Sequence, residues 1–263
     1  MTRFGFWILT LVLGACGGGD DTEPDPPEVV DEDGDGSPVE EDCDDTDPNV
    51  YPAAPELCDQ RANDCNTMGE WSEADEAGTA MFTDSDGNMS DFTGSIAGAE
   101  DTPASVTVSE AGRIDLCEGT FYAGLELSAD LELVSHGEVA LSGAGQVTIL
   151  TVLEEDITVT ASGLTLQDGM ATVASDITDE IKGEAGGAIN ADVSSTVELQ
   201  DVMLKDNSGE YAGAIFAGNG AVIDGVDITT EGNSSDLGSA IALVAHGANL
   251  ELENLTSAES GRL

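Results

Sequence analysis

Residues 186–263 read, in three lines of 26, GGAINADVSSTVELQDVMLKDNSGEY (186–211), AGAIFAGNGAVIDGVDITTEGNSSDL (212–237) and GSAIALVAHGANLELENLTSAESGRL (238–263). The fourth residue of each line is Ile189, Ile215 or Ile241, and small residues precede it. A fixed period of roughly 20–50 residues is typical of a solenoid, in which successive repeats stack on one another. We therefore expect side chains 26 positions apart to lie one above the next.

Short alternating stretches fill these lines and the sequence before them. Aliphatic residues recur two positions apart with polar residues between them, which is the periodicity of strands with one face buried, and Gly or Asn separates the stretches as turns. The pairs are Leu125/Leu127, Leu131/Leu133, Val147/Ile149, Ile157/Val159, Leu164/Leu166, Val197/Leu199, Val226/Ile228 and Leu250/Leu252. A β-sandwich is the alternative, because it explains the alternation, but it does not explain three lines in register.

The solenoid interpretation makes three local predictions. Asn207 and Asn233 occupy the same place in their lines and should form an amide ladder at a corner. Gly187 and Gly213 should allow a sharp bend that a Cβ would hinder. The stretch 170–185 is too long and acidic for a corner, so we expect it to leave the coil as a surface loop.

The charge balance restricts the function. The chain has 263 residues, with 54 acidic against 6 basic side chains and a net charge of −48. Nothing in it can neutralise nucleic-acid phosphates, and attraction to an anionic membrane through basic residues is excluded as well. Aromatic residues are few (2 Trp, 3 Tyr and 6 Phe), so the core must consist of Val, Ile, Leu and Ala.

The first residues form an export signal. Arg3 precedes an apolar run, Phe4–Leu13, which is too short to span a bilayer permanently. The following Leu13-Gly14-Ala15-Cys16 resembles the lipobox of bacterial lipoprotein signal peptides. This resemblance implies cleavage of a signal peptide (1–15), lipidation of Cys16 and anchoring to a membrane; the lack of Asp after Cys16 suggests the outer membrane and the cell surface. An ordinary secretory signal with a chance Cys is the alternative.

An acidic leader (residues 16–67) follows, and it begins with a flexible linker (16–30). From residue 31 the sequence DEDGDG places carboxylates at alternate positions before Gly, and Asp42 is the twelfth residue counted from Asp31. This is the ligand spacing of an EF-hand-type calcium loop. The Pro-rich sequence before it excludes the first helix of a full EF-hand, so we expect an isolated calcium loop; an unliganded acidic loop is the alternative.

Residues 31–65 closely resemble the MopE-type metal-binding repeat of secreted deltaproteobacterial surface proteins, which reads DxDGDG and then DCDDxDPxVxPGAxExCDxxDNDC. This sequence departs from the pattern at Ala54-Pro55 and at Arg61-Ala62, where one Asp is lost. The resemblance implies a calcium-like structural site in a motif at residues 31–67. The expected ligands are Asp31, Asp33, Asp35, Asp42, Asp44, Asp45, Asp47, Asp59 and Asp64.

The cysteines leave several pairings open. If Cys16 is lipidated, four remain, and four allow three pairings. Cys58 and Cys65 are close enough for a short loop, and Cys43 competes for either. Disulfides are expected in an oxidising compartment, with a thiolate zinc or copper site as the alternative.

After a connecting segment (68–101), in which 84–88 is expected to be a turn, residues 102–263 resemble two families of bacterial surface protein. The GGAI-type line starts resemble polymorphic outer-membrane-protein repeats, and stretches such as IDLCEGTFY (114–122) resemble coils of pectin-lyase-like proteins. Both imply an all-β fold, a right-handed parallel β-helix, here of six or seven coils. The last line ends where a further line would begin, so we expect a fragment of a longer protein; the alternative is that something else covers the open edge of the last coil.

No catalytic constellation stands out. The repeat region has four basic residues other than His: Arg113, Lys182, Lys205 and Arg262. Its two histidines, His136 and His246, are each followed by Gly, so we interpret both as polar turn residues.

The leading hypothesis is a non-catalytic, calcium-stabilised surface lipoprotein that presents a β-helix to a glycan or a partner protein. The alternatives are a polysaccharide-acting β-helix enzyme, a lyase or glycoside hydrolase, and a metal-scavenging surface protein.

Overall fold

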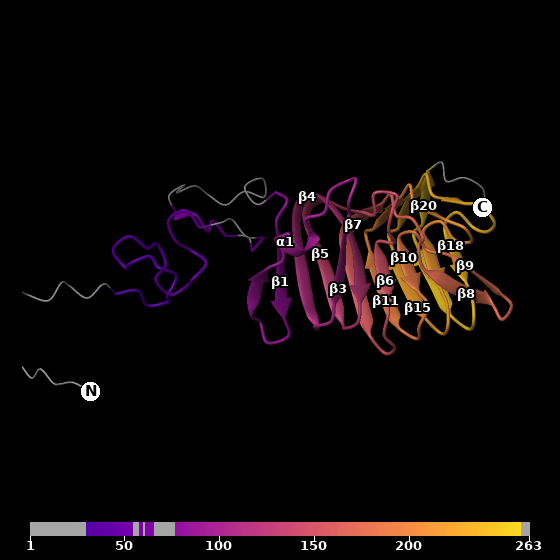
Figure 1. Ribbon diagram of the computed structural model, residues 1–263, viewed down its shortest axis with the longest axis horizontal. Coiled ribbons are helices and arrows are strands. Elements are labelled where there is room, and N and C mark those ends of the chain that lie inside the picture. The colour runs from indigo at the N-terminus through magenta and orange to yellow at the C-terminus, as the bar shows by residue number, and fades with distance from the viewer. Residues whose placement is uncertain (1–29, 55–57, 60, 66–76, 259–263) are drawn as a thin grey trace, which may run out of the picture.

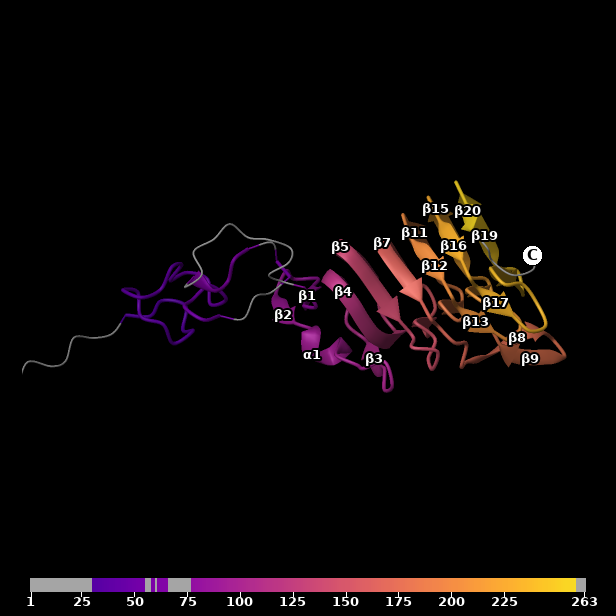
Figure 2. The same cartoon turned by 90° about the horizontal axis from the view of Figure 1, so that it is seen from above.

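The computed structural model describes residues 30–54, 58–59, 61–65 and 77–258, which form an all-β protein (Figure 1). The signal peptide, Cys16 and nearly all of the linker lie outside the described residues. Among the residues that are described, no helix has the length and apolar character that crossing a membrane requires. The acidic leader lies at one end of a stack of coils, and Figure 2 shows the same stack from above.

Three ladders of parallel strands run the length of the stack. The first joins β3 (Ala104–Val108), the end of β4 (Gly112–Leu127), β6 (Leu150–Val152), β10 (Ile189–Ala191), β14 (Ile215–Ala217) and β18 (Ala242–Val244). The second joins the start of β4 to β5 (Leu131–Ser142), β7 (Thr158–Gln167), β11 (Thr196–Gln200), β15 (Val222–Val226) and β19 (Asn249–Glu253). The third joins later parts of β4, β5 and β7 to β12 (Met203–Lys205), β16 (Thr229–Glu231) and β20 (Thr256–Ala258).

The chain visits the three ladders in turn, so each coil adds one strand to each ladder. The predicted all-β, parallel-coil architecture is therefore confirmed. The first ladder has six strands among the described residues, which gives six coils. The hand of the coil stays a prediction, which the right-handed preference of parallel crossover connections supports.

The core lies between the three ladders and is made of stacked aliphatic side chains. Leu150, Ile189 and Ile215 occupy one register position in three successive coils and are each at most 1% exposed. The predicted amide ladder is present: Asn207 Nδ2 donates to Asn233 Oδ1 at 3.0 Å, and both residues are fully buried. Asn207 Oδ1 in turn accepts from the Gly169 N–H at 2.8 Å, which extends the ladder by a coil.

The predicted uniform period fails in the last coil. Ser208 pairs with Ser234, 26 positions later, but Ala212 pairs with Ser239 and Ile215 with Ala242, 27 positions later. The extra residue lies within 236–238, where Leu237 projects into solvent with 65% of its surface exposed. The expectation that Ile241 stacks on Ile215 is therefore wrong, although Ile241 is still buried at 6% exposure.

Two of the predicted strand pairs are also wrong, and in a third pair Ile157 lies one residue before β7, which contains Val159. Val147 and Ile149 precede the strand, which begins at Leu150. Val226 ends β15 with its side chain outward at 38% exposure, and the next residue, Asp227, has φ 58°. Asp201 and Asn254 repeat this left-handed conformation at the same corner, with φ 52° and 55°. Asp and Asn tolerate the left-handed region of φ and ψ better than other residues with a Cβ. Some of the acidic residues of the solenoid are therefore present because its corners require this backbone conformation.

The predicted surface excursion is a hairpin of β8 (Ala174–Thr178) and β9 (Ile181–Glu184), which projects beside the last coils (Figures 1 and 2). It covers an outward-facing aromatic side chain: Phe216 lies between the inward Ile215 and Ala217 on β14, and is nevertheless fully buried. Ile177 of the hairpin packs against the cluster that contains Phe216. The small strands β13 (Ser208–Gly209) and β17 (Ser234–Ser235) pair at the neighbouring corner.

An antiparallel cap covers the opposite end of the stack. β1 (Ala80–Asp84) pairs antiparallel with the start of β4, and β2 (Met89–Asp91) pairs with β1. The segment 84–88 is the expected turn between these strands, closed by hydrogen bonds from the Asn88 N–H and side-chain amide to Asp84. The short helix α1 (Thr93–Ile96) follows and buries Ile96 in the core.

The bend at Gly187 provides a test of the coil packing. A Cβ at this position would lie 2.5–2.7 Å from the carbonyl oxygens of Ser208, Gly169 and Gly213, all of which are backbone atoms. We expect Gly187→Ala to lower the free energy of unfolding by about 2–3 kcal/mol and Tm by several degrees. The matched control is Gly94→Ala, whose Cβ meets nothing within 4 Å. Thermal unfolding followed by circular dichroism measures both; equal Tm values would contradict the close approach of these coils.

Candidate metal centre

In the first acidic loop, which begins at Asp31, the carboxylates accept hydrogen bonds from backbone N–H groups of the loop itself. Asp31 accepts from the N–H groups of Gly34 at 2.7 Å and Gly36 at 3.1 Å. Both glycines have positive φ, 85° and 102°, a region that a residue with a Cβ rarely adopts. The alternation of Asp with Gly is therefore what lets the chain curl tightly around the Asp31 side chain.

Three further carboxylates each use one oxygen in the same way. Oδ1 of Asp33, Asp35 and Asp42 accepts from the N–H group two residues later, at 3.2, 2.6 and 2.9 Å. The other oxygen, Oδ2, of each of these three residues is buried and has no hydrogen-bond partner. Buried carboxylate oxygens without a partner are costly, because they lose water and gain nothing in return.

The electrostatics of the loop favour a bound cation. Ligand oxygens of Asp31, Asp33 and Asp35 lie within 4.8 Å of one another. Burial raises the pKa of Asp33, and repulsion from Asp35, Asp42 and Asp31 raises it further. A divalent cation among these oxygens would offset the repulsion between the carboxylates of Asp31, Asp33 and Asp35, so the residues present fit a metal ion with hard oxygen ligands.

The other five predicted ligands are placed differently. Asp45 accepts from the Glu32 N–H at 3.1 Å, and Asp64 accepts from the Ala53 N–H at 2.7 Å, so both tie segments of the leader together. Asp44 and Asp47 form ion pairs with Arg61, the former at 3.3 Å. Asp59 accepts from the Arg61 N–H at 3.0 Å. The structure therefore separates the nine aspartates into three sets. These are a loop cluster, Asp31, Asp33, Asp35 and Asp42; an Arg61 group, Asp44, Asp47 and Asp59; and Asp45 and Asp64, which accept from backbone N–H groups elsewhere in the leader.

The pKa values in the Arg61 group follow from these contacts. Burial raises the pKa of Asp47, but hydrogen bonds from the Asn49 N–H and from Arg61 outweigh it, so the pKa lies below its ordinary value. Burial raises the pKa of Asp59, and there the hydrogen bonds from Asn63 and Arg61 do not compensate. The hydrogen bond to Asp47 raises the pKa of Arg61 itself, so the guanidinium stays protonated.

Two disulfides fasten the leader. Cys43 pairs with Cys65 within it, and Cys58 pairs with Cys117 on β4, which attaches the leader to the first coil. These pairs resolve the alternatives that the sequence left open, and a thiolate site on these four cysteines is excluded because all four sulfurs are bonded. Cys58 and Cys117 are buried together with Met81 of the cap.

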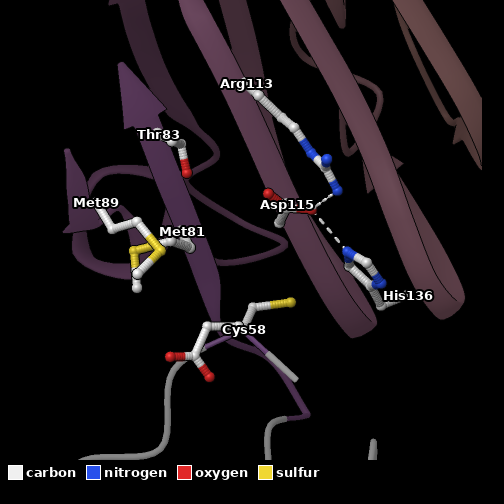
Figure 3. Close-up of a pocket in the computed structure, with 8 residues that line it drawn as sticks. Cys58, Met81, Thr83, Met89, Arg113, Asp115 and His136 are labelled. Carbon is white, nitrogen blue, oxygen red and sulfur yellow. Dashed lines mark hydrogen bonds and ion pairs between the residues drawn. The ribbon is translucent and has the colours of Figure 1, made fainter. Parts of the chain in front are cut away.

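A pocket of about 250 Å³ lies where the leader meets the cap and the second ladder (Figure 3). Asp115 lines it, with one oxygen in contact with Arg113 and 2.7 Å from His136 Nε2. The interpretation of His136 as a turn residue is wrong, because it lies in β5 and its side chain is only 13% exposed. His246 does lie in a turn, with φ 49°. The sequence contains a signal for this contact. If residues 112–117 and 131–136 are aligned as neighbouring strands, Cys117 pairs with His136, and His136 lies beside this site.

Comparison with known proteins supports the motif. The family model described as "Putative metal-binding motif", whose name specifies copper binding of the MopE type, matches residues 42–70. The match begins at Asp42, so it contains the Arg61 group, while Asp31, Asp33 and Asp35 precede it. Comparison with curated proteins and with solved structures gives no match for this chain.

The raised pKa of Asp33 predicts how metal affinity depends on pH. The protonated form of Asp33 stabilises the metal-free loop below the ordinary pKa of 3.8, and this stabilisation is lost as pH rises through the raised value. A metal ion binds a carboxylate in its deprotonated form, so the affinity of the loop for a metal ion should fall as pH decreases through that same raised pKa.

Removal of one loop carboxylate tests the same geometry by calorimetric titration with calcium. We expect Asp35→Asn to weaken calcium binding about tenfold or more, because it removes charge from an oxygen that has no other partner. Asp86→Asn makes the same charge change in the exposed turn between β1 and β2 and serves as the control. Equal affinities for the two variants, or an affinity that does not change with pH, would contradict the proposed ligands.

Proposed function

We propose that this chain is a non-catalytic lipoprotein of the outer-membrane surface, whose calcium-loaded leader holds a parallel β-helix away from the membrane for contact with a partner protein or a glycan. The observation that carries the proposal is the set of three buried, partnerless carboxylate oxygens in a leader that a disulfide fastens to the first coil. A disulfide-fastened acidic segment next to a rigid rod is suited to spacing rather than to chemistry.

The choice of calcium rests on the donor atoms. All four residues of the loop cluster offer carboxylate oxygens, which suit hard cations, and none offers the thiolate, thioether or imidazole that copper prefers. The twelve-residue spacing from Asp31 to Asp42 is that of a calcium loop. The copper in the name of the matching family model favours a metal-scavenging protein instead; competition among Ca²⁺, Cu²⁺ and Zn²⁺ for the same site separates these candidates.

The surface location is supported by the disulfides and the charge. Two disulfides require an oxidising compartment, which agrees with export by the lipobox-like signal. A net charge of −48 repels anionic lipid headgroups, so an anchored chain of this kind extends away from the membrane. A single acyl chain binds a bilayer only marginally, and the multiple acylation that the lipobox resemblance implies would hold it stably.

One observation favours the enzyme alternative. A groove of about 440 Å³ on the outer face of the second ladder is lined by Glu132, Glu198 and Asp224, and paired carboxylates are what glycoside hydrolysis needs. These acids occupy one column of the ladder, since Glu198 pairs with Asp224 and both Glu132 and Glu198 pair with Thr160. A column of like residues is also what in-register stacking produces without selection for catalysis, so we favour the non-catalytic function.

Loss of the anchor tests the proposal directly. In cells that express the full chain, we expect the wild-type protein to sediment with membranes and to be cleaved by protease added outside intact cells. The Cys16→Ser variant should leave the membrane fraction almost completely, to about a tenth of the wild-type amount or less. Ser90→Ala, a change of similar size in an exposed strand, is the control. Membrane attachment that survives Cys16→Ser would contradict the anchor, and release of reducing sugar from a glycan panel would favour the enzyme.

A further inference from the structure

The two disulfides of the leader are not the pairs that chain length favours. Cys43–Cys65 and Cys58–Cys117 join residues 22 and 59 positions apart, whereas Cys58 and Cys65 are separated by only 65 − 58 = 7 positions. The entropic cost of closing a loop of n residues rises as (3/2)RT ln n, so in an unfolded chain Cys65 contacts Cys58 about five times as often as it contacts Cys43. Order in the leader must therefore bring Cys43 to Cys65.

Apolar packing can direct one of these disulfides but not the other. Cys58 and Cys117 are 3% and 0% exposed and lie in one buried cluster with Met81, so contact between the leader and the cap brings them together. Cys43 is exposed and belongs to none of the hydrophobic clusters of the described residues. The position of Cys43 therefore depends on polar contacts.

These polar contacts belong to the loop cluster, whose last residue, Asp42, directly precedes Cys43. Asp42 Oδ1 accepts from the Asp44 N–H at 2.9 Å, while Asp42 Oδ2 is buried without a partner among the described residues. Asp45 Oδ1 accepts from the Glu32 N–H at 3.1 Å, which ties the chain after Cys43 to the start of the loop. The direction of the Cys43 side chain therefore follows from the order of the loop.

Cys65 is placed by contacts that need no cation. The preceding residue, Asp64, accepts from the Ala53 N–H at 2.7 Å, and Tyr51 forms a parallel bridge with Asp64. Of the two cysteines in this disulfide, Cys43 is therefore the one whose position depends on the loop cluster.

We propose that a divalent cation at the loop cluster brings Cys43 to Cys65 and thereby selects the native disulfide pairing. This inference rests on the proposed function, because it assumes that calcium binds the loop cluster. If calcium binds only chains with the native pairing, it favours that pairing by a factor of 1 + [Ca²⁺]/Kd, which is about a hundredfold at about 100 Kd. A factor of this size outweighs the preference of about fivefold for the short Cys58–Cys65 loop.

The chemical step is ordinary thiol–disulfide exchange, in which calcium is neither oxidised nor reduced. A protein thiol loses its proton and attacks oxidised glutathione, which releases one reduced glutathione and leaves a mixed disulfide. The second protein thiol loses its proton and displaces the other glutathione, so two thiols become one disulfide and two electrons pass to glutathione. Reduced glutathione reverses wrong pairs, and the final distribution of pairs then reports their relative stability.

The test is the disulfide map of the full chain with Cys16→Ser, which leaves four thiols for pairing. The reduced, unfolded protein is reoxidised with glutathione in calcium or in chelator at equal ionic strength, trapped with acid and mapped by peptide mass spectrometry. We expect both native pairs in calcium. In chelator the fraction of chains with Cys43–Cys65 should be at least about threefold smaller, with Cys58–Cys65 in its place.

Two matched variants separate the loop cluster from charge in general. Asp35→Asn removes a charge from the loop cluster, and in calcium it should give the same map as the wild type in chelator. Asp86→Asn makes the same change in the exposed turn between β1 and β2 and should give the wild-type map. Wild-type pairing in Asp35→Asn, or identical maps of the wild type in calcium and in chelator, overturns the inference.

Calorimetric titration of the native, already oxidised protein with calcium decides the proposed function separately. Calcium binding there, together with pairing that ignores calcium, overturns this inference and leaves the proposed function intact. Absence of calcium binding overturns the metal part of the proposed function itself.

A second measurement covers the case in which the reduced chain does not refold. The native protein is reduced with dithiothreitol in calcium or in chelator, and the rate of loss of each disulfide is followed. Calcium should slow the reduction of Cys43–Cys65 at least about threefold, and the reduction of Cys58–Cys117, which depends on packing, should not change. Equal rates for Cys43–Cys65 in the two conditions overturn the inference.

Discussion

The architecture depends on backbone hydrogen bonds between coils that lie in register. A parallel ladder forms only when each residue of one coil stands beside its equivalent in the next, so each side chain meets the same kind of side chain above and below. In the interior this gives aliphatic columns and the buried Asn207–Asn233 ladder. On the outer face it also places Glu198, Asp224 and Glu251 in direct register, although like charges opposite one another are destabilising. The solenoid tolerates its acidity because the stacked core beneath it supplies the compensating stability.

The leader has no such core. Among its described residues, only Val50, Ala54, Cys58 and Asn63 are buried. Its order therefore comes from three other sources: the two disulfides, the backbone hydrogen bonds that curl around aspartate side chains, and positive charge among the carboxylates. The first two are present within the described residues, and Arg61 supplies part of the third. At the partnerless oxygens of Asp33, Asp35 and Asp42, a bound cation would supply further positive charge.

The sequence predicts those features that repeat or that are local. The period predicted the parallel coils and the amide ladder, and the Asp–Gly alternation predicted the curled loop, because each depends on residues at fixed offsets. The sequence did not predict where the period slips: the extra residue at 236–238 bulges outward and costs little, so it leaves no mark on the aliphatic pattern. The predicted pairing of Val226 with Ile228 on one buried face is wrong because Asp227, with its positive φ, reverses the alternation of inward and outward side chains.

The sequence did not predict contacts between residues far apart in the chain, and the reason is different. Four cysteines allow three pairings of similar plausibility, and Cys58–Cys117 depends on how the leader packs on the cap. The contact between Asp115 and His136 depends on the register of β4 with β5, in a coil shorter than the later 26-residue lines. The 26-residue repeat that reveals the last coils is absent there, so the period did not point to the alignment of 112–117 with 131–136.

We propose that a divalent cation orders the leader, whereas the solenoid is ordered without one. Hydrogen exchange of backbone amides, compared in calcium and in chelator, tests this most directly. We expect calcium to slow exchange in residues 31–50 about tenfold or more. Amides of β10 and β14, whose order comes from stacked coils, should exchange at the same rate in both conditions. Leader exchange that is identical with and without calcium would contradict the account, as would equal slowing in the leader and the coils.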